Sequence, residues 1–390
     1  MFSNRTDWQL TRNRLTEALE EVRSSGARVL DLTISNPTRA SLLYNSAAIL
    51  SSLASPKALD YDPQPKGLPS ARAAVAAYYR TTHGLRDFDL DRLILTTSTS
   101  EGYSFLFRLL CNPGDELLVP KPSYPLFEFL ADLQDVKLVP YPLIYDHGWQ
   151  MDVPSLQKAV TERTRGVVVV HPNNPTGSLV KAHELTLLNA FCREHKLALI
   201  VDEVFLDYAH DGKTRPSFAA NQDVLTFTLS GVSKISALPQ MKVAWIATSG
   251  PRTEVEKATA RLEVISDTYL SMNAPIQWAT PALLEQRHNI QRQLLERVLG
   301  NLAELDRQLA GQKACQRLSV EGGWCAVLRV PVTQTDEELA VDLLRRKAVL
   351  VHPGHFYDFP SDGYLVLSLI EQEGEFAEGI VRLLELLTAD

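Results

Sequence analysis

The most reactive candidate in this chain is a lysine that follows an apolar, β-prone run. The run is Val224-Leu225-Thr226-Phe227-Thr228-Leu229, and the next residues are Ser230-Gly231-Val232-Ser233-Lys234. Burial among small residues disfavours an ammonium ion, which lowers a lysine pKa and frees the amine to attack a carbonyl. The position of Lys234 therefore indicates a Schiff-base nucleophile, although a surface lysine in a loop can have the same local sequence.

Two upstream apolar runs also end in polar residues. The run Val167-Val168-Val169-Val170 leads into the turn His171-Pro172-Asn173-Asn174-Pro175-Thr176-Gly177, and Leu197-Ala198-Leu199-Ile200-Val201 ends at Asp202. Ligands of open α/β sheets bind at the carboxyl ends of the strands. We therefore expect the polar groups at these strand ends to form a ligand site together with Lys234.

Three motifs make this sequence similar to a known family. They are Asn-Asn-Pro-Thr-Gly at 173–177, Asp-Glu-Val-Phe at 202–205 and Ser-Lys at 233–234, in that order. The sequence resembles the aspartate-aminotransferase superfamily, the class I/II aminotransferases of fold type I, over nearly its whole length. The resemblance implies pyridoxal 5′-phosphate (PLP) as the cofactor and an obligate homodimer with shared active sites.

The resemblance assigns four residues to the PLP ring. Lys234 would carry the cofactor, and Asp202 would keep the pyridine nitrogen protonated so that the ring acts as an electron sink. Asn174 would donate to the phenolate oxygen, and Tyr124 would stack on the ring. Other readings remain open: Asp202 as a helix or turn cap, Asn-Pro as a simple turn former, and Tyr124 as a core tyrosine.

A phosphate site is expected at a small-residue turn between a strand and a helix. Ser98, Thr99 and Ser100 occupy this turn, where helix N–H groups and hydroxyls can bind a dianion, although a plain N-cap has the same pattern. Lys242 stands where the family usually has an arginine on the phosphate, and lysine keeps the charge without the bidentate fork. Tyr61 resembles the tyrosine that reaches the phosphate of the neighbouring subunit.

The residues expected near the substrate depart from the family pattern. Ser35 replaces the usual glycine of the N-terminal turn, and Phe205 replaces a tyrosine. Val366 stands where the family normally has the arginine that clamps the substrate carboxylate, so the standard clamp is missing or supplied elsewhere. We hypothesise that Arg39 supplies the charge, alongside Ser35 and Asn174 as substrate residues; the alternative is that Arg39 is a solvated surface arginine.

Composition narrows the class of protein. The 390 residues are 45% hydrophobic and 22% charged, as in an ordinary water-soluble protein of two domains. The net charge of −8 argues against a nucleic-acid or anionic-membrane partner. The first residues, 1–7, contain no apolar h-region, so we expect no signal peptide, and no apolar run is long enough to span a bilayer. Its four scattered cysteines suit a reducing compartment, so we expect a cytoplasmic protein.

The order of expected elements predicts an α/β protein with two domains. Strands alternate with helices through the middle of the chain, which predicts a mostly parallel, doubly wound sheet in a large PLP-binding domain, 46–280. The last hundred residues have an α+β pattern, with a long helix near 285–310, and are expected to form a small domain, 281–390. The family resemblance implies that the N-terminal segment, 1–45, joins this small domain.

These observations predict a PLP-dependent aminotransferase that moves an amino group between an amino acid or amine and a 2-oxo acid through a Lys234 Schiff base. One fold supports many PLP reactions, so a C–S/β-lyase or a decarboxylase is the alternative. A non-catalytic PLP-domain binding protein is less favoured. Regulators of that kind carry a DNA-binding domain, and this chain has no basic extension to hold one. The absence of Lys234 would have supported a binding protein, but Lys234 is present.

Overall fold

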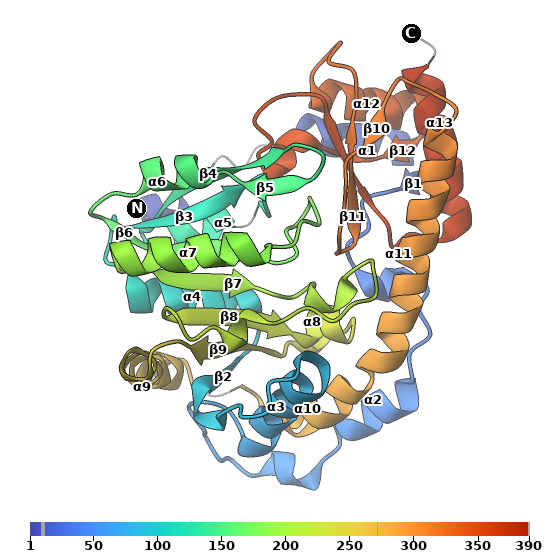
Figure 1. Ribbon diagram of the computed structural model, residues 1–390. Coiled ribbons are helices and arrows are strands. Elements are labelled where there is room, and N and C mark those ends of the chain that lie inside the picture. The colour runs from blue at the N-terminus through green and yellow to red at the C-terminus, as the bar shows by residue number, and fades with distance from the viewer. Residues whose placement is uncertain (9–11, 126, 271, 389–390) are drawn as a thin grey trace.

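The computed structural model describes residues 1–8, 12–125, 127–270 and 272–388. Its main sheet has eight strands (Figure 1). Their order across the sheet is β2 (Leu93–Thr96), β9 (Ala244–Ser249), β8 (Thr226–Gly231), β7 (Ala198–Asp202), β6 (Thr164–Val170), β3 (Glu116–Lys121), β4 (Lys137–Tyr145) and β5 (Trp149–Met151).

Strand direction brings six strand ends to one edge of this sheet. Strands β3, β4, β6, β7 and β8 are paired in parallel. Strand β9 runs antiparallel to both β8 and β2, so β2 has the same direction as β8. The carboxyl ends of β2, β3, β4, β6, β7 and β8 therefore lie at the same edge, and the predicted mostly parallel sheet is confirmed.

Both faces of the sheet are buried, as a doubly wound fold requires. Val168 and Ile200 belong to one apolar cluster, whereas Val167 and Leu199 belong to another, because successive side chains of a strand point to opposite faces. The helices of this part of the chain are α2 (Ser46–Ser52), α3 (Pro69–His83), α4 (Thr99–Leu110), α5 (Phe127–Asp132), α6 (Val153–Ala159), α7 (Ala182–His195), α8 (Val232–Ile235), α9 (Arg252–Thr268) and α10 (Ala274–Glu285).

A second, antiparallel sheet contains β10 (Gln316–Arg317), β11 (Cys325–Arg329), β14 (Tyr364–Ser368) and β13 (His352–Pro353). It packs with α1 (Arg14–Ser24), α11 (Arg287–Leu309), α12 (Asp336–Lys347) and α13 (Glu373–Leu387). The short strand β1 (Leu30–Asp31) pairs in parallel with β12 (Val349–Leu350). Figure 1 shows α11 running along the side of the molecule from α10 towards this second sheet.

Most predicted elements are confirmed, and the misses have local causes. The long helix expected near 285–310 is α11. The hairpin of β4 and β5 and the helices α10 and α13 were not predicted; β4 contains two prolines, which usually argue against an inner strand. Near the N-terminus, Trp8 donates to Asp132 of α5 at 2.9 Å, so this residue contacts the main-sheet part of the chain. The domain limits stay a prediction.

Among the described residues, no helix combines the length and the apolar character needed to cross a bilayer.

The turn that carries Asn174 packs closely against residues 320–322, which lead into the second sheet. Gly177 has φ +67°, and a Cβ there would overlap Val320 and the carbonyl oxygen of Gly322. The Gly177 carbonyl also accepts a hydrogen bond from Glu321 N at 3.2 Å. A side chain at position 177 would therefore push the Asn174 turn away from the 320–322 segment.

We predict that Gly177→Ala lowers the free energy of unfolding by about 1–3 kcal/mol more than Gly212→Ala does, as expected for overpacking. Gly212 is a matched control because its φ is +68° and a Cβ there meets nothing within 4 Å. Thermal or urea unfolding of the two variants measures the difference. Equal losses would show that backbone strain alone, and not this contact, matters at position 177.

Candidate active site

The strand ends of the main sheet and one face of the second sheet enclose a cavity of about 340 Å³. Its size is within the range of cofactor and small-ligand sites. Seven of the sequence-predicted site residues line it together: Ser35, Thr99, Ser100, Tyr124, Asn174, Asp202 and Lys234. The cavity is therefore the candidate active site.

Lys234 is half-buried in this cavity on the short helix α8. Burial lowers the pKa of Lys234 to about 8, and the charges of Cys325 and Asp202 oppose the shift only in part. Its Nζ lies 4.8 Å from the ring centroid of Trp324 and 5.3 Å from that of Phe205. Two aromatic rings thus give the lysine apolar surroundings. Its amine loses its proton near pH 8, and the neutral amine is the form that acts as a nucleophile.

Three hydrogen bonds hold the backbone around Lys234. Tyr208 Oη donates to the Lys234 carbonyl at 2.6 Å, and Gln291 Nε2 donates to the Ile235 carbonyl at 3.0 Å. Tyr44 Oη donates to the Ala237 carbonyl at 2.8 Å. These donors anchor the backbone of α8 and of the turn that follows it, and so hold the Cα of Lys234 in position.

Asp202 ends β7 and is oriented by two donors. Val204 N donates to Oδ1 at 3.1 Å, and Tyr103 Oη donates to Oδ2 at 3.2 Å. Burial nevertheless raises the pKa of Asp202 to about 6, since these hydrogen bonds and the charge of Lys234 offset the desolvation only partly. A buried carboxylate whose desolvation is only partly offset favours a cationic partner in the cavity.

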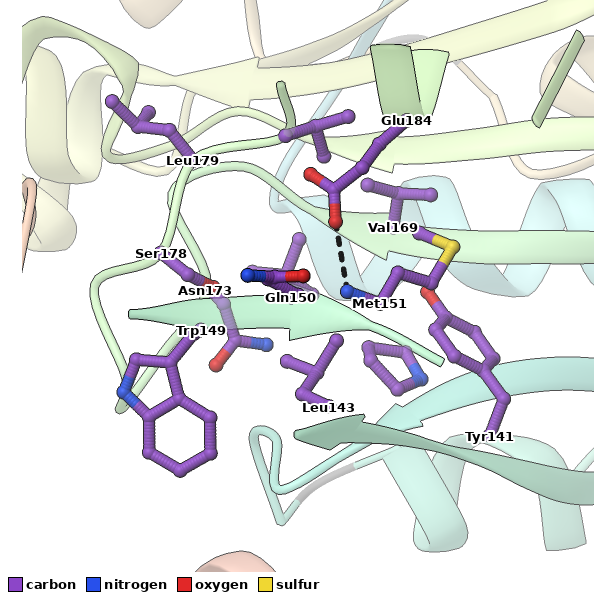
Figure 2. Close-up of a pocket in the computed structure, with 13 residues that line it drawn as sticks. Tyr141, Leu143, Trp149, Gln150, Met151, Val169, Asn173, Ser178, Leu179 and Glu184 are labelled. Carbon is purple, nitrogen blue, oxygen red and sulfur yellow. Dashed lines mark hydrogen bonds between the residues drawn. The ribbon is translucent and has the colours of Figure 1, made fainter. Parts of the chain in front are cut away.

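Asn174 lines the cavity at the turn after β6, and its neighbour Asn173 holds the turn together. Asn173 Oδ1 accepts from Thr176 Oγ1 at 2.8 Å and from Thr176 N at 3.3 Å. Figure 2 shows Asn173 facing a second, smaller cavity of about 20 Å³, where Glu184 accepts from Met151 N at 2.8 Å. That space holds roughly one water molecule, so it supports the turn and is no substrate site.

The residues predicted for phosphate have separate positions at the start of α4. Ser98 is the N-cap, and its hydroxyl accepts from Glu101 N at 3.1 Å, so this side chain does not line the cavity. Thr99 and Ser100 do line it, in the first helical turn, where backbone N–H groups have no intrahelical acceptor. The turn therefore offers two hydroxyls and helix N–H groups to an anion.

Three other predicted residues lie outside the cavity of the single chain. Arg39, Lys242 and Tyr61 are exposed, Tyr61 to 81%. Exposure of Tyr61 is what a role in a neighbouring subunit requires. Arg39 lies on a 3₁₀ turn, Pro37–Arg39, and does not line the cavity that Val366 lines.

The cavity residues that the sequence analysis did not assign to the site include four with polar or aromatic side chains: Trp324, Cys325, His352 and Tyr357. All four belong to the second sheet or to segments joined to it. The Gly-Gly-Trp sequence at 322–324 was the one available signal, because paired glycines often mark a close approach of backbones. The other three positions follow from strand pairing that no local pattern reveals.

Comparison with known proteins agrees with this geometry. Residues 27–373 match the family described as aminotransferase class I and II. The chain belongs to this family. Members are generally PLP-dependent transaminases, and this protein is accordingly an aminotransferase.

Its relatives within the family include alanine aminotransferase of Mycobacterium tuberculosis, 29% identical over 371 residues, covering 92% of this chain and 86% of the relative. A glutamate–pyruvate aminotransferase of Escherichia coli is 30% identical over 275 residues, covering 70% of this chain and 67% of the relative. The solved alanine aminotransferase of Pyrococcus furiosus superposes with a TM-score of 0.91 at 22% identity, covering 100% of both chains. This last similarity supports the aminotransferase fold.

The raised pKa of Asp202 predicts how this aminotransferase responds to pH without its cofactor. Because the folded-state pKa of about 6 exceeds the usual 3.8, the ionised carboxylate costs stability above pH 6, and the cost disappears as pH falls towards 4. Asp202→Asn should therefore stabilise the cofactor-free protein by about 1–3 kcal/mol at pH 7 and by much less at pH 4.5. Denaturant unfolding at the two pH values measures the effect.

Asp211→Asn is the control of opposite sign. The Lys213 backbone N–H and the Arg215 guanidinium lower the pKa of the exposed Asp211 carboxyl, so this substitution should not stabilise the protein at pH 7. A gain at Asp202→Asn that does not depend on pH would contradict desolvation as its cause.

Proposed function

We propose that this protein is a PLP-dependent aminotransferase that moves an amino group between an amino acid or amine and a 2-oxo acid, with Lys234 as the covalent carrier of the cofactor. The observation that carries the proposal is the half-buried Lys234 amine, with a pKa of about 8, in one cavity with Asp202 and Asn174. Reactive amines in PLP enzymes are activated by such desolvation.

The residues present fit PLP by their chemistry. Asp202 has a raised pKa and two donors already in place, so a protonated pyridine nitrogen would supply the cation that it lacks. Thr99 and Ser100, at the start of α4, would hold the phosphate. Asn174 would donate to the ring oxygen and Tyr124 would cover one ring face. When bound, PLP supplies an electron sink that stabilises negative charge at the substrate Cα.

Lys234 would also move the proton in the reaction. Its pKa of about 8 places the amine near the operating pH of a cytoplasmic enzyme, which favours general-base and general-acid action. Nζ would take a proton from the substrate Cα and deliver it to the C4′ position of the cofactor. The hydrogen bonds to the carbonyls of Lys234 and Ile235 would keep this amine in position.

The names of the relatives support the substrate class. Relatives named alanine aminotransferase and glutamate–pyruvate aminotransferase favour an amino-acid donor and a 2-oxo acid acceptor for this chain. Val366 in the place of the family's carboxylate arginine leaves an amine donor without an α-carboxylate as a second possibility. A screen of single amino acids and amines, followed by loss of cofactor absorbance, separates the two.

We further propose a cytoplasmic homodimer. Leu43, Leu50, Leu59 and Tyr61 are exposed by 76, 63, 90 and 81%, and an exposed apolar stretch of this kind is typical of a subunit interface. Lys242, with Tyr61 of the second subunit, would then complete the phosphate site that Thr99 and Ser100 begin. The cysteines are free thiols, which suits a reducing compartment.

Lys234→Ala should abolish turnover and leave the fold intact. Borohydride reduction of the holoenzyme, followed by peptide mapping, should place a pyridoxyl group on Lys234. Circular dichroism of the variant checks the fold. A label on another lysine, or none, would overturn this assignment.

Tyr61→Ala should weaken cofactor retention by roughly tenfold, because a hydrogen bond to a charged group is lost. If sites are shared, mixing Tyr61→Ala with Lys234→Ala chains should restore activity, since one site of each mixed dimer has both residues intact. Light scattering gives the oligomeric state. An active monomer, or mixtures no better than the separate variants, would rule out the shared site.

A further inference from the structure

One face of the second sheet forms the wall of the cavity opposite Lys234. Cys325, His352, Val366 and Ser368 all line the cavity. Val366 is paired with His352 on β13, and Ser368 with Cys325 on β11. Side chains of directly paired residues in an antiparallel sheet lie on the same face with their Cβ atoms about 4.5–5.5 Å apart. His352 is thus the polar neighbour of the space that an arginine at position 366 would occupy.

The imidazole of His352 has a fixed orientation. Its Nδ1 lies 3.0 Å from Tyr357 Oη. Tyr357 is buried, and its backbone carbonyl accepts a hydrogen bond from Ser123 N at 2.9 Å, next to Tyr124. When the tyrosine hydroxyl donates to Nδ1, the ring proton stays on Nε2, and among the described residues Nε2 has no partner. In this tautomer His352 offers a free N–H donor in the cavity wall, next to Val366.

On the basis of the proposed aminotransferase function, we infer that His352, oriented by Tyr357, contacts the substrate carboxylate in place of the missing arginine. An imidazole N–H can donate one hydrogen bond to a carboxylate oxygen, where a guanidinium donates two. The described residues that line the cavity include no arginine, and Lys234 is required for the cofactor.

The surroundings keep this histidine neutral at physiological pH. Burial lowers the pKa of His352, and the negative charge of Asp31 opposes the shift only in part. A neutral donor binds a carboxylate less tightly than a guanidinium does, because it contributes no net charge. The site should therefore discriminate less between an amino acid and the corresponding amine than an arginine-containing site would.

The test measures carboxylate binding and substrate preference separately. Propanoate is titrated into the holoenzyme, and the half-reactions of L-alanine and of ethylamine, which lacks the carboxylate, are followed by cofactor absorbance. His352→Leu should raise the propanoate Kd and lower kcat/KM for L-alanine by roughly 10- to 100-fold, the effect of losing a hydrogen bond to a charged group. The rate with ethylamine should stay unchanged.

Matched variants separate recognition from folding. His355→Leu is the control, since His355 is exposed on the 3₁₀ turn that follows β13, Gly354–Tyr357, and does not line the cavity. Tyr357→Phe should weaken propanoate binding by a smaller factor, because it releases the ring orientation and keeps the donor. Val366→Arg in the His352→Leu background should restore propanoate binding, which a merely damaged fold would not allow.

Three results would overturn the inference. The first is propanoate binding to His352→Leu as tightly as to the wild type, and the second is no propanoate binding by the wild type. The third is an L-alanine-specific loss in Arg39→Ala and none in His352→Leu, which would assign the clamp to Arg39. Each of these results leaves the pyridoxyl label on Lys234 unchanged, so failure here is distinct from failure of the proposed function.

Discussion

The active site depends on the desolvation of two opposite charges at neighbouring strand ends. Lys234 follows β8 and Asp202 ends β7, and burial moves both pKa values towards neutrality, to about 8 and about 6. Each shift makes the folded chain less stable without a ligand and more receptive to one. The hydrogen bonds from Tyr103, Val204 and Tyr208 keep the two groups in place at this cost.

A buried polar network behind Lys234 ties the site to the long helix α11. Gln291 on α11 donates both to the Ile235 carbonyl and, at 2.6 Å, to Asp207 Oδ2. Asp207 also accepts from Tyr78 Oη of α3 at 3.0 Å. Helix α11 leads into the second sheet, so the helix that precedes this sheet in the chain is hydrogen-bonded to α8, which carries the lysine. Displacement of α11 would therefore change the position of both.

The second sheet completes the cavity through contacts that are distant in sequence. Ser368 N donates to the Leu32 carbonyl at 2.7 Å, and Ser368 Oγ donates to the Ile34 carbonyl. These bonds attach the N-terminal segment with Ser35 to the strand that carries Val366. One wall of the cavity is thus built from segments at opposite ends of the chain, whereas Asn174, Asp202 and Lys234 come from its middle.

The sequence by itself determined the main sheet, the family and three polar residues at strand ends that line one cavity. Valine-rich runs followed by Asn174, Asp202 and Lys234 are local signals, and parallel pairing necessarily brings their ends to one edge. Ser98 was predicted from the same kind of signal, but its hydroxyl is used as the cap of α4. Only the tertiary structure decided that His352 and Tyr357 face the cavity and that Arg39 is exposed outside it. Those positions depend on the register between β13 and β14 and on the packing of the two sheets, which are non-local contacts that a single sequence does not specify.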